Sequence, residues 1–169
     1  MANTIFLSLG SNLGDRERNL KKACEMLAVM EGFEWIGASS IYVTQPVEME
    51  PDTPSFLNMV VKGEFEFTPL ELLRNLENIE NKLGRESKGD KQPRPIDIDI
   101  LLFGDRKFKN KQLMIPHPRM TKRAFVLVPL LQIEPDVVHP ITGKKLEGYL
   151  KRKEADSLIL YRESVRDHV

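Results

Sequence analysis

The chain has 169 residues, of which 41% are hydrophobic, and it carries 25 basic and 25 acidic side chains. This length and apolar content predict a single domain, residues 1–169, with a real core. A net charge of zero argues against long-range attraction to nucleic acid or an anionic membrane. No signal peptide or bilayer-spanning apolar run is evident, so we expect a cytoplasmic protein. The one cysteine, Cys24, excludes an intrachain disulfide and is predicted to be a core residue of a helix.

The predicted elements alternate between strands and helices over the first hundred residues. Thr68 and Glu71 form a capping box with Pro69 at the first helical position, which predicts a helix that ends at Gly84. In chain order, we expect a strand at Thr4–Leu9, a turn at Gly10–Gly14, a helix capped by Asp15, a strand at Trp35–Val43, a strand at Phe56–Val61 that continues to Phe67, the helix that follows Thr68, and a strand at 94–103.

The last of these strands contains two candidate metal-binding aspartates. Side chains along a strand alternate between faces, so Asp97 and Asp99 project from one face, about 6.6 Å apart. The opposite face would turn apolar side chains into a core: Ile96, Ile98, Ile100 and Leu102. Adjacent carboxylates repel each other, and a divalent cation such as Mg²⁺ removes that repulsion. The alternative is a half-exposed strand with a solvated acidic face.

Two polar loops flank this strand face. The first, residues 45–55, contains three prolines and is too polar and proline-rich to be regular. The second, residues 85–95, carries four basic side chains: Arg85, Lys88, Lys91 and Arg94. Basic groups beside a carboxylate pair favour a nucleoside triphosphate with Mg²⁺, since they can contact phosphate oxygens. A solvated charged loop is the alternative.

The order β-α-β-β-α-β predicts an α+β fold with a ferredoxin-like core, an antiparallel sheet with both helices on one face. The other face would be open and would gather Asp97, Asp99, Phe56 and Asn58 around one cleft. C-terminal additions to this core are expected: an edge strand near Lys107–Lys109, a short helix at Lys122–Ile133 interrupted by Pro129, a helix around Leu146–Arg152 and an extended segment at Leu158–Tyr161.

Common nucleotide-binding motifs are absent from the sequence. Gly10–Gly14 lacks the Gly-Lys-Ser/Thr ending of a Walker A loop, and the protein-kinase motifs are missing as well. His117 lies between two prolines in a rigid segment. It is predicted either to donate to a phosphate or to be a structural histidine.

Several segments occur in the order and spacing of a known family: Leu9–Gly14, Tyr42–Pro46, Phe56–Asn58, Gly84–Arg85, Pro93–Ile100, Pro116–Met120 and Arg123–Leu127. They resemble the 6-hydroxymethyl-7,8-dihydropterin pyrophosphokinases of folate biosynthesis, over about residues 3–140. The resemblance implies transfer of the pyrophosphoryl group of ATP to the pterin hydroxymethyl oxygen, with release of AMP. It implies a small-molecule enzyme, without nucleic-acid or membrane partners, and we expect a monomer.

The resemblance also assigns residues to roles. Asp97 and Asp99 are implied to hold two Mg²⁺ ions, and together with Arg85 and Arg94 to be catalytic. The implied ATP-binding residues are Glu80, Arg85, Lys91, Arg94, Ile100, His117 and Arg123. The implied pterin-binding residues are Thr44, Pro46, Val47, Phe56, Asn58 and Phe125, with the two phenylalanines sandwiching the flat ring and Asn58 reading its amide-like edge.

The basic loop departs from the family pattern. Asp90–Arg94 lacks the tryptophan and glycine common there, and Ser87 replaces a second arginine, so Lys88 or Lys91 would have to substitute. Two other classes stay open. One is a Mg²⁺-dependent nucleotidyl- or phosphoryltransferase on a similar sheet, and the other is an RNA-binding module with exposed aromatic side chains.

Overall fold

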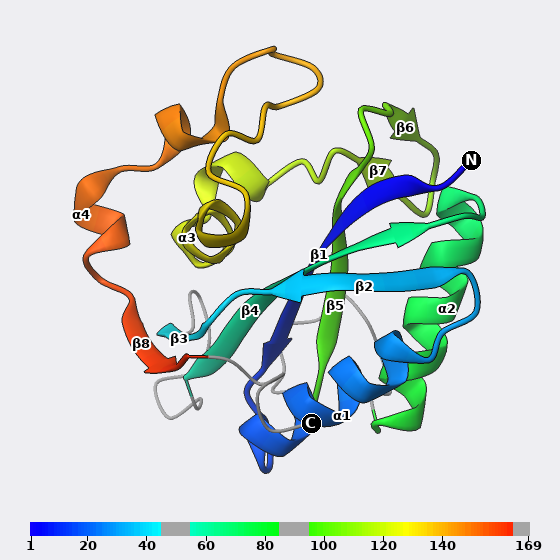
Figure 1. Ribbon diagram of the computed structural model, residues 1–169. Coiled ribbons are helices and arrows are strands. Elements are labelled where there is room, and N and C mark those ends of the chain that lie inside the picture. Colours follow the sequence, from blue (N-terminus) through cyan, green and yellow to red (C-terminus); the bar gives the residue numbers. More distant parts are fainter. Residues whose placement is uncertain (45–54, 85–94, 164–169) are drawn as a thin grey trace.

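The computed structural model describes residues 1–44, 55–84 and 95–163 (Figure 1). Within these ranges, six antiparallel strands form one sheet in the order β5-β1-β4-β3-β8, and β2 pairs with β4 next to β3. The first elements are β1 (Asn3–Ser11), α1 (Arg16–Ala28), β2 (Phe33–Ala38), β3 (Ile41–Thr44), β4 (Phe56–Phe65), α2 (Pro69–Lys82) and β5 (Asp97–Phe103). They are followed by β6 (Phe108–Lys109), β7 (Met114–Ile115), the 3₁₀ turn η1 (Met120–Lys122), α3 (Ala124–Ile133), the 3₁₀ turn η2 (Leu146–Tyr149), α4 (Arg152–Ala155) and β8 (Ile159–Arg162).

Both predicted helix starts are confirmed. The Asp15 carboxylate accepts a hydrogen bond from the Arg18 N–H at 3.1 Å, which caps α1. At α2 the Thr68 hydroxyl accepts from the Glu71 N–H and the Glu71 carboxylate accepts from the Thr68 N–H. These bonds satisfy backbone donors that the first helical turn leaves without partners.

Helices α1 and α2 cover one face of the sheet (Figure 1). Their apolar stripes pack on the alternate residues of β1 and its neighbours, and Cys24 is buried among them as predicted. The fully buried members of this cluster include Ile5, Leu7 and Leu9 from β1, Leu20 and Leu27 from α1, and Leu72 and Leu76 from α2.

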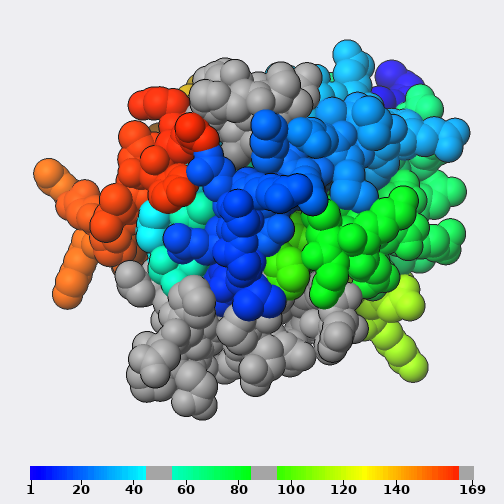
Figure 2. Space-filling view, turned by 90° about the horizontal axis from the view of Figure 1, so that it is seen from below, coloured from blue at the N-terminus to red at the C-terminus, as the bar shows by residue number. Residues whose placement is uncertain are grey.

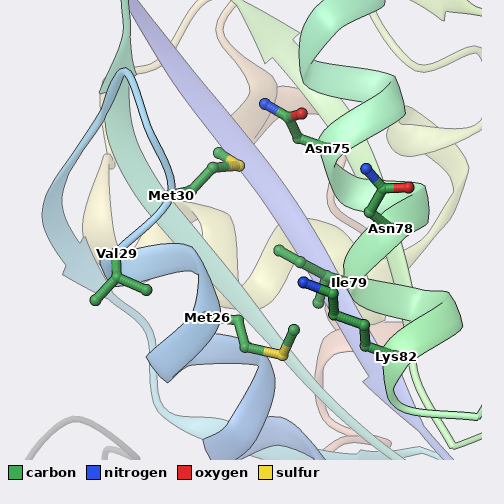
Figure 3. Close-up of a pocket in the computed structure, with 7 residues that line it drawn as sticks. All are labelled: Met26, Val29, Met30, Asn75, Asn78, Ile79 and Lys82. Carbon is green, nitrogen blue, oxygen red and sulfur yellow. The ribbon is translucent and has the colours of Figure 1, made fainter.

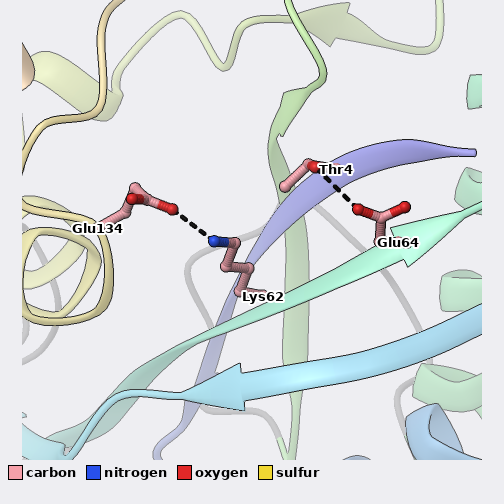
Figure 4. A network of polar contacts seen from close by, with 4 residues as sticks. All are labelled: Thr4, Lys62, Glu64 and Glu134. Atoms are coloured by element: carbon pink, nitrogen blue, oxygen red, sulfur yellow. Dashed lines mark hydrogen bonds and ion pairs between the residues drawn. The ribbon is translucent and has the colours of Figure 1, made fainter.

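The opposite face is not open along its whole length, so that part of the fold prediction was wrong. Helix α3 packs there on a second cluster built around Phe6, Val60 and Leu130. An ion pair joins the C-terminal end of α3 to β4, because the Lys62 ammonium lies 2.5 Å from the Glu134 carboxylate (Figure 4). The same ammonium also lies 5.8 Å from the centre of the Phe6 ring.

The segment predicted as one strand, Trp35–Val43, is two strands. Ala38 pairs with Val61 and Tyr42 with Asn58, so β2 and β3 follow the same edge of β4 with an extra residue between them. The Ser39 hydroxyl accepts the Val60 N–H at 2.8 Å at this break. A side chain thus replaces a backbone acceptor of the ladder, and the pairing starts again in a new register.

A second irregularity changes the predicted faces of β5. Phe6 pairs with Leu102, whereas Leu7 pairs with Ile100, so Leu101 is an extra residue on β5. Beyond this bulge the alternation is reversed, and Leu102 joins the cluster under α3 instead of the one under α1 and α2. The prediction that Leu102 shares a face with Ile98 and Ile100 was therefore wrong.

The C-terminal part differs from the sequence prediction in detail. The strand predicted near residue 108 pairs with β7 in a separate two-stranded sheet. Helix α3 continues through the buried Pro129, and the helix predicted around residue 149 is replaced by η2 and α4. Strand β8 is close to the predicted extended segment and pairs with β3.

The C-terminal strand returns to the N-terminal helix. Arg162 forms an ion pair with Glu17 of α1, and the Tyr161 hydroxyl donates to the same carboxylate. Figure 2 shows these C-terminal residues in red against the blue N-terminal segment. Across residues 1–44, 55–84 and 95–163, no helix has the length and apolar character needed to cross a bilayer.

Candidate active site

The register of four strands places polar side chains in rows on the face that α1 and α2 leave uncovered. Asp97 lies opposite Gly10, Gly10 opposite Asn58, and Asn58 opposite Tyr42. Directly opposed residues of antiparallel strands share a face, so these four residues form one row. Asp99 belongs to the next row, opposite Ser8.

The two aspartates share this face as predicted. Both are half-buried, while Ile96, Ile98 and Ile100 between and around them are buried on the other face. The structure thus confirms the alternation on which the predicted carboxylate pair depends.

Gly10 forms the floor between the carboxylates and Asn58. A Cβ atom at this position would lie 3.0 Å from the Asn58 Oδ1 atom and 3.5 Å from a ring carbon of Phe56. The absence of a side chain therefore lets the amide and the ring stand close to the backbone.

The Asn58 amide is held in one orientation. Its Nδ2 atom donates to the Thr44 hydroxyl oxygen at 2.6 Å, and both residues are buried. This bond directs Oδ1 toward the Gly10 side of the row. An amide offers a donor and an acceptor side by side, which suits a ligand with an amide-like edge.

Two of the predicted ATP-binding residues lie away from this face. Glu80 projects from α2, is buried, and accepts the Ile98 N–H at 2.8 Å. Since Ile98 separates the two aspartates, the Glu80 carboxylate holds this part of β5 from the helix side. The Ile100 side chain is buried in the cluster under α1 and α2, so only its backbone could contact a ligand.

His117 and the start of α3 contribute further groups. The His117 N–H donates to the Leu101 carbonyl at 2.9 Å, which fixes this segment to β5. Its Nδ1 atom accepts from the Arg119 N–H at 3.1 Å, so in the neutral ring Nε2 carries the proton. The Arg123 guanidinium lies 5.4 Å from the centre of the Phe125 ring, and this ring packs against the cluster under α3.

The structure therefore brings together part of the predicted site. Five of the predicted residues share the sheet face, Phe125 of α3 packs on the cluster at that face, and Arg123 lies against the Phe125 ring; the five are Thr44, Phe56, Asn58, Asp97 and Asp99. Five further predicted positions, Pro46, Val47, Arg85, Lys91 and Arg94, lie outside the described residues.

The carboxylate pair could hold a metal ion only with help from other ligands. In the part of the chain that the structure describes, no group of three or more His, Cys, Asp or Glu side chains could hold an ion. Two carboxylates without a full protein cage fit Mg²⁺, which commonly keeps several waters and binds substrate phosphates. The donor set on this face therefore fits the predicted ion.

A hollow of about 320 Å³ lies on the other side of the sheet, between α1 and α2 (Figure 3). Its lining is apolar or amide-bearing except for Lys82, and includes Met26, Met30, Asn75, Asn78 and Ile79. It offers no carboxylate, thiol or imidazole, so it is not the candidate active site.

Sequence reasoning missed three residues of the sheet face opposite α1 and α2. Ser8 and Gly10 alternate with the buried Leu7 and Leu9, and this alternation was a signal that could have placed them beside the aspartates. Tyr42 could be placed only by the register of β3 on β4.

Comparisons with known proteins identify the family of this chain. Residues 6–135 match the family model for 7,8-dihydro-6-hydroxymethylpterin-pyrophosphokinase (HPPK). The 2-amino-4-hydroxy-6-hydroxymethyldihydropteridine pyrophosphokinase of Aquifex aeolicus is 41% identical over 86% of this chain and 89% of its own length. The Bacillus subtilis protein of the same name is 44% identical over 79% of each chain. The chain therefore belongs to the HPPK family.

Some relatives are much longer. The Schizosaccharomyces pombe folic acid synthesis protein fol1 is 40% identical over 92% of this chain, but the match spans only 21% of its length. The crystal structure of wild-type Plasmodium falciparum HPPK-DHPS with pterin and p-hydroxybenzoate has a TM-score of 0.68 at 18% identity, over 88% of this chain and 42% of that one. This likeness supports the mixed fold of antiparallel sheet and helices.

Proposed function

We propose that this protein transfers the pyrophosphoryl group of ATP to the hydroxymethyl oxygen of 6-hydroxymethyl-7,8-dihydropterin, giving the pterin diphosphate and AMP in folate biosynthesis. The family membership supports this reaction. The observation that carries it is the row in which Asp97 and Asn58 stand on either side of Gly10, with Asp99 in the adjoining row. A carboxylate pair suited to phosphate chemistry thus lies beside an amide suited to a pterin.

The pterin would lie at the Asn58 end of the row. The amide held by Thr44 would pair with the edge of the heterocycle through one donor and one acceptor. Phe56 and Phe125 would cover its two faces, since flat aromatic systems stack well on rings. Pro46 and Val47 belong to the same proposed pocket.

The triphosphate would lie at the aspartate end. Asp97 and Asp99 would hold Mg²⁺, as two ions by the family pattern, and the bound metal would neutralise phosphate charge and align the phosphates. His117 and Arg123 would donate to phosphate oxygens, together with Arg85, Lys91 and Arg94. Phosphoryl transfer demands mainly positioning and charge stabilisation, which these donors supply.

The order of strands supports a more specific description of the fold. From the strand order β5-β1-β4, with β2 and β3 sharing the outer edge of β4, we infer a ferredoxin-like core, to which α3, α4 and β8 would be C-terminal additions. We propose that residues 1–169 form one domain that acts as a monomer on small molecules, without nucleic-acid partners.

Analysis of the products tests the reaction. The purified protein is mixed with ATP, Mg²⁺ and the reduced pterin, and the nucleotide products are separated by chromatography. The proposal predicts AMP and pterin diphosphate in equal amounts, and no AMP when the pterin is left out. Release of inorganic pyrophosphate from ATP would instead indicate a nucleotidyltransferase and would contradict the proposal.

A further inference from the structure

Helix α3 carries one polar side chain on an otherwise apolar sequence. Residues 124–133 read Ala-Phe-Val-Leu-Val-Pro-Leu-Leu-Gln-Ile, and Gln132 is the single polar residue among them. Apolar contacts are not directional, so on their own they define the rotation and height of a helix less sharply than a hydrogen bond does. The hydrogen bonds of a single amide on such a helix can fix its rotation and height.

The Gln132 amide is bonded at both ends to strand β3 and the residue before it. Its Oε1 atom accepts the Ser40 N–H at 2.8 Å and the Tyr42 hydroxyl at 3.2 Å. Its Nε2 atom donates to the Ser40 hydroxyl at 2.7 Å. These three bonds join residues that are about 90 positions apart in the chain, and Ser40 itself is buried.

The tethered strand and helix are those that carry the proposed pterin pocket. Tyr42 lies in the same row as Asn58 and Gly10, and Thr44 ends the same strand. On the helix, Phe125 is seven residues before Gln132. Seven residues are about two helical turns, so the two side chains project from the same side of α3, about 10 Å apart along its axis.

We propose that Gln132 is a positioning residue for the pterin pocket. Its amide fixes the height and rotation of α3 over the sheet face opposite α1 and α2, and so sets where the Phe125 ring stands relative to Asn58. The Lys62–Glu134 ion pair holds the same helix end to β4, but a single ion pair leaves rotation about it possible. This role rests on the proposed function and extends it to a residue that contacts neither substrate.

The test compares substrate affinity with stability. Gln132→Leu removes all three bonds, whereas Gln132→Glu keeps the two acceptor bonds and can accept from the Ser40 hydroxyl. Thr4→Val is the matched control, since it removes a 3.3 Å bond to Glu64 at the other end of the sheet (Figure 4). For each protein one measures the Kd of the pterin, the KM of ATP, kcat and urea unfolding.

Gln132→Leu is expected to weaken pterin binding on the order of tenfold, because coupling through a packed element is typically worth 0.5–2 kcal/mol, or about 2- to 30-fold. The KM of ATP should change by less than about threefold, and Gln132→Glu should bind the pterin nearly as well as wild type. Should Gln132→Leu fail to fold, Ser40→Ala removes only the Nε2 bond and is expected to weaken pterin binding by about two- to fivefold.

Three results would overturn parts of this account. The first is a pterin affinity within twofold of wild type, either in a Gln132→Leu protein that is less stable or in Ser40→Ala. It would show that Gln132 contributes to stability only and does not position the pterin pocket. An equal loss in Thr4→Val would show that any weakening of the sheet has this effect, and would also reject the role. A wild-type protein that binds no pterin would instead reject the proposed function.

Discussion

Gly10 offers the sharpest test of the site, because a single added methyl group would fill the floor of the row. In Gly10→Ala the new Cβ atom would lie 3.0 Å from the Asn58 Oδ1 atom, so the amide would have to retreat by a few tenths of an ångström. It cannot retreat toward Thr44, since that bond is already short at 2.6 Å. The orientation of the amide would therefore be lost.

The expected cost falls on binding more than on stability. Replacing Gly by Ala stabilises a chain by about 0.4–1 kcal/mol through the unfolded state, which offsets part of the crowding. One lost hydrogen bond to the pterin is worth about 0.5–1.5 kcal/mol, and the methyl group also meets the bound ring. We therefore expect pterin binding about tenfold weaker, with a free energy of unfolding within about 1 kcal/mol of wild type.

The assay pairs pterin titration by calorimetry with urea unfolding. Gly37→Ala is the matched control, since this glycine is also in a strand of the sheet, β2, and a Cβ atom there would have no neighbour within 4 Å. It should bind the pterin like wild type. If Gly10→Ala binds the pterin as tightly as Gly37→Ala does, the row is not the floor of the pterin site.

Three other substitutions test the scaffold around the site. Thr68→Ala removes the capping box of α2 and should lower the free energy of unfolding, measured in urea, by about 1 kcal/mol. An unchanged free energy of unfolding would contradict the role of the cap. Glu80→Ala removes the carboxylate that accepts the Ile98 N–H and should lower the free energy of unfolding by about 1–3 kcal/mol. Glu80→Gln keeps an acceptor and should lower it less, so equal losses in the two variants would contradict the role of this bond. Burial lowers the pKa of His139, so the folded state resists the proton that the unfolded chain accepts below about pH 6.5, and stability should fall as the pH drops through that value. His139→Asn should lack this component of the pH dependence, and an unchanged profile would contradict the assignment.

Local patterns predicted the parts of the fold that depend on neighbours in sequence. The capping box located the start of α2, and alternation placed Asp97 and Asp99 on one face. The faces beyond Leu101 could not be predicted, because the bulge there depends on how β5 pairs with β1. The division of β2 from β3 likewise depends on Ser39 and its bond to Val60, 21 residues away.

The covering of the second sheet face was the largest difference from the prediction. The apolar character of residues 122–133 predicted a short helix but contained no information on where that helix packs. Its place is determined by contacts between distant segments, namely the apolar cluster with Phe6 and Val60 and the polar contacts of Gln132 with Ser40 and Glu134 with Lys62. The assignment of single residues to ATP or pterin came from the family resemblance, while the structure adds which of them share a face.

The central claim is that the carboxylate pair on β5 carries the chemistry, and the rate of AMP formation tests it most directly. Asp97→Ala and Asp99→Ala are compared with Asp105→Ala, an exposed aspartate in the turn that follows the same strand. Loss of several kcal/mol of charge stabilisation should slow each site variant by about three orders of magnitude or more, with urea unfolding unchanged and Asp105→Ala as active as wild type. Undiminished AMP formation in either site variant would contradict the account.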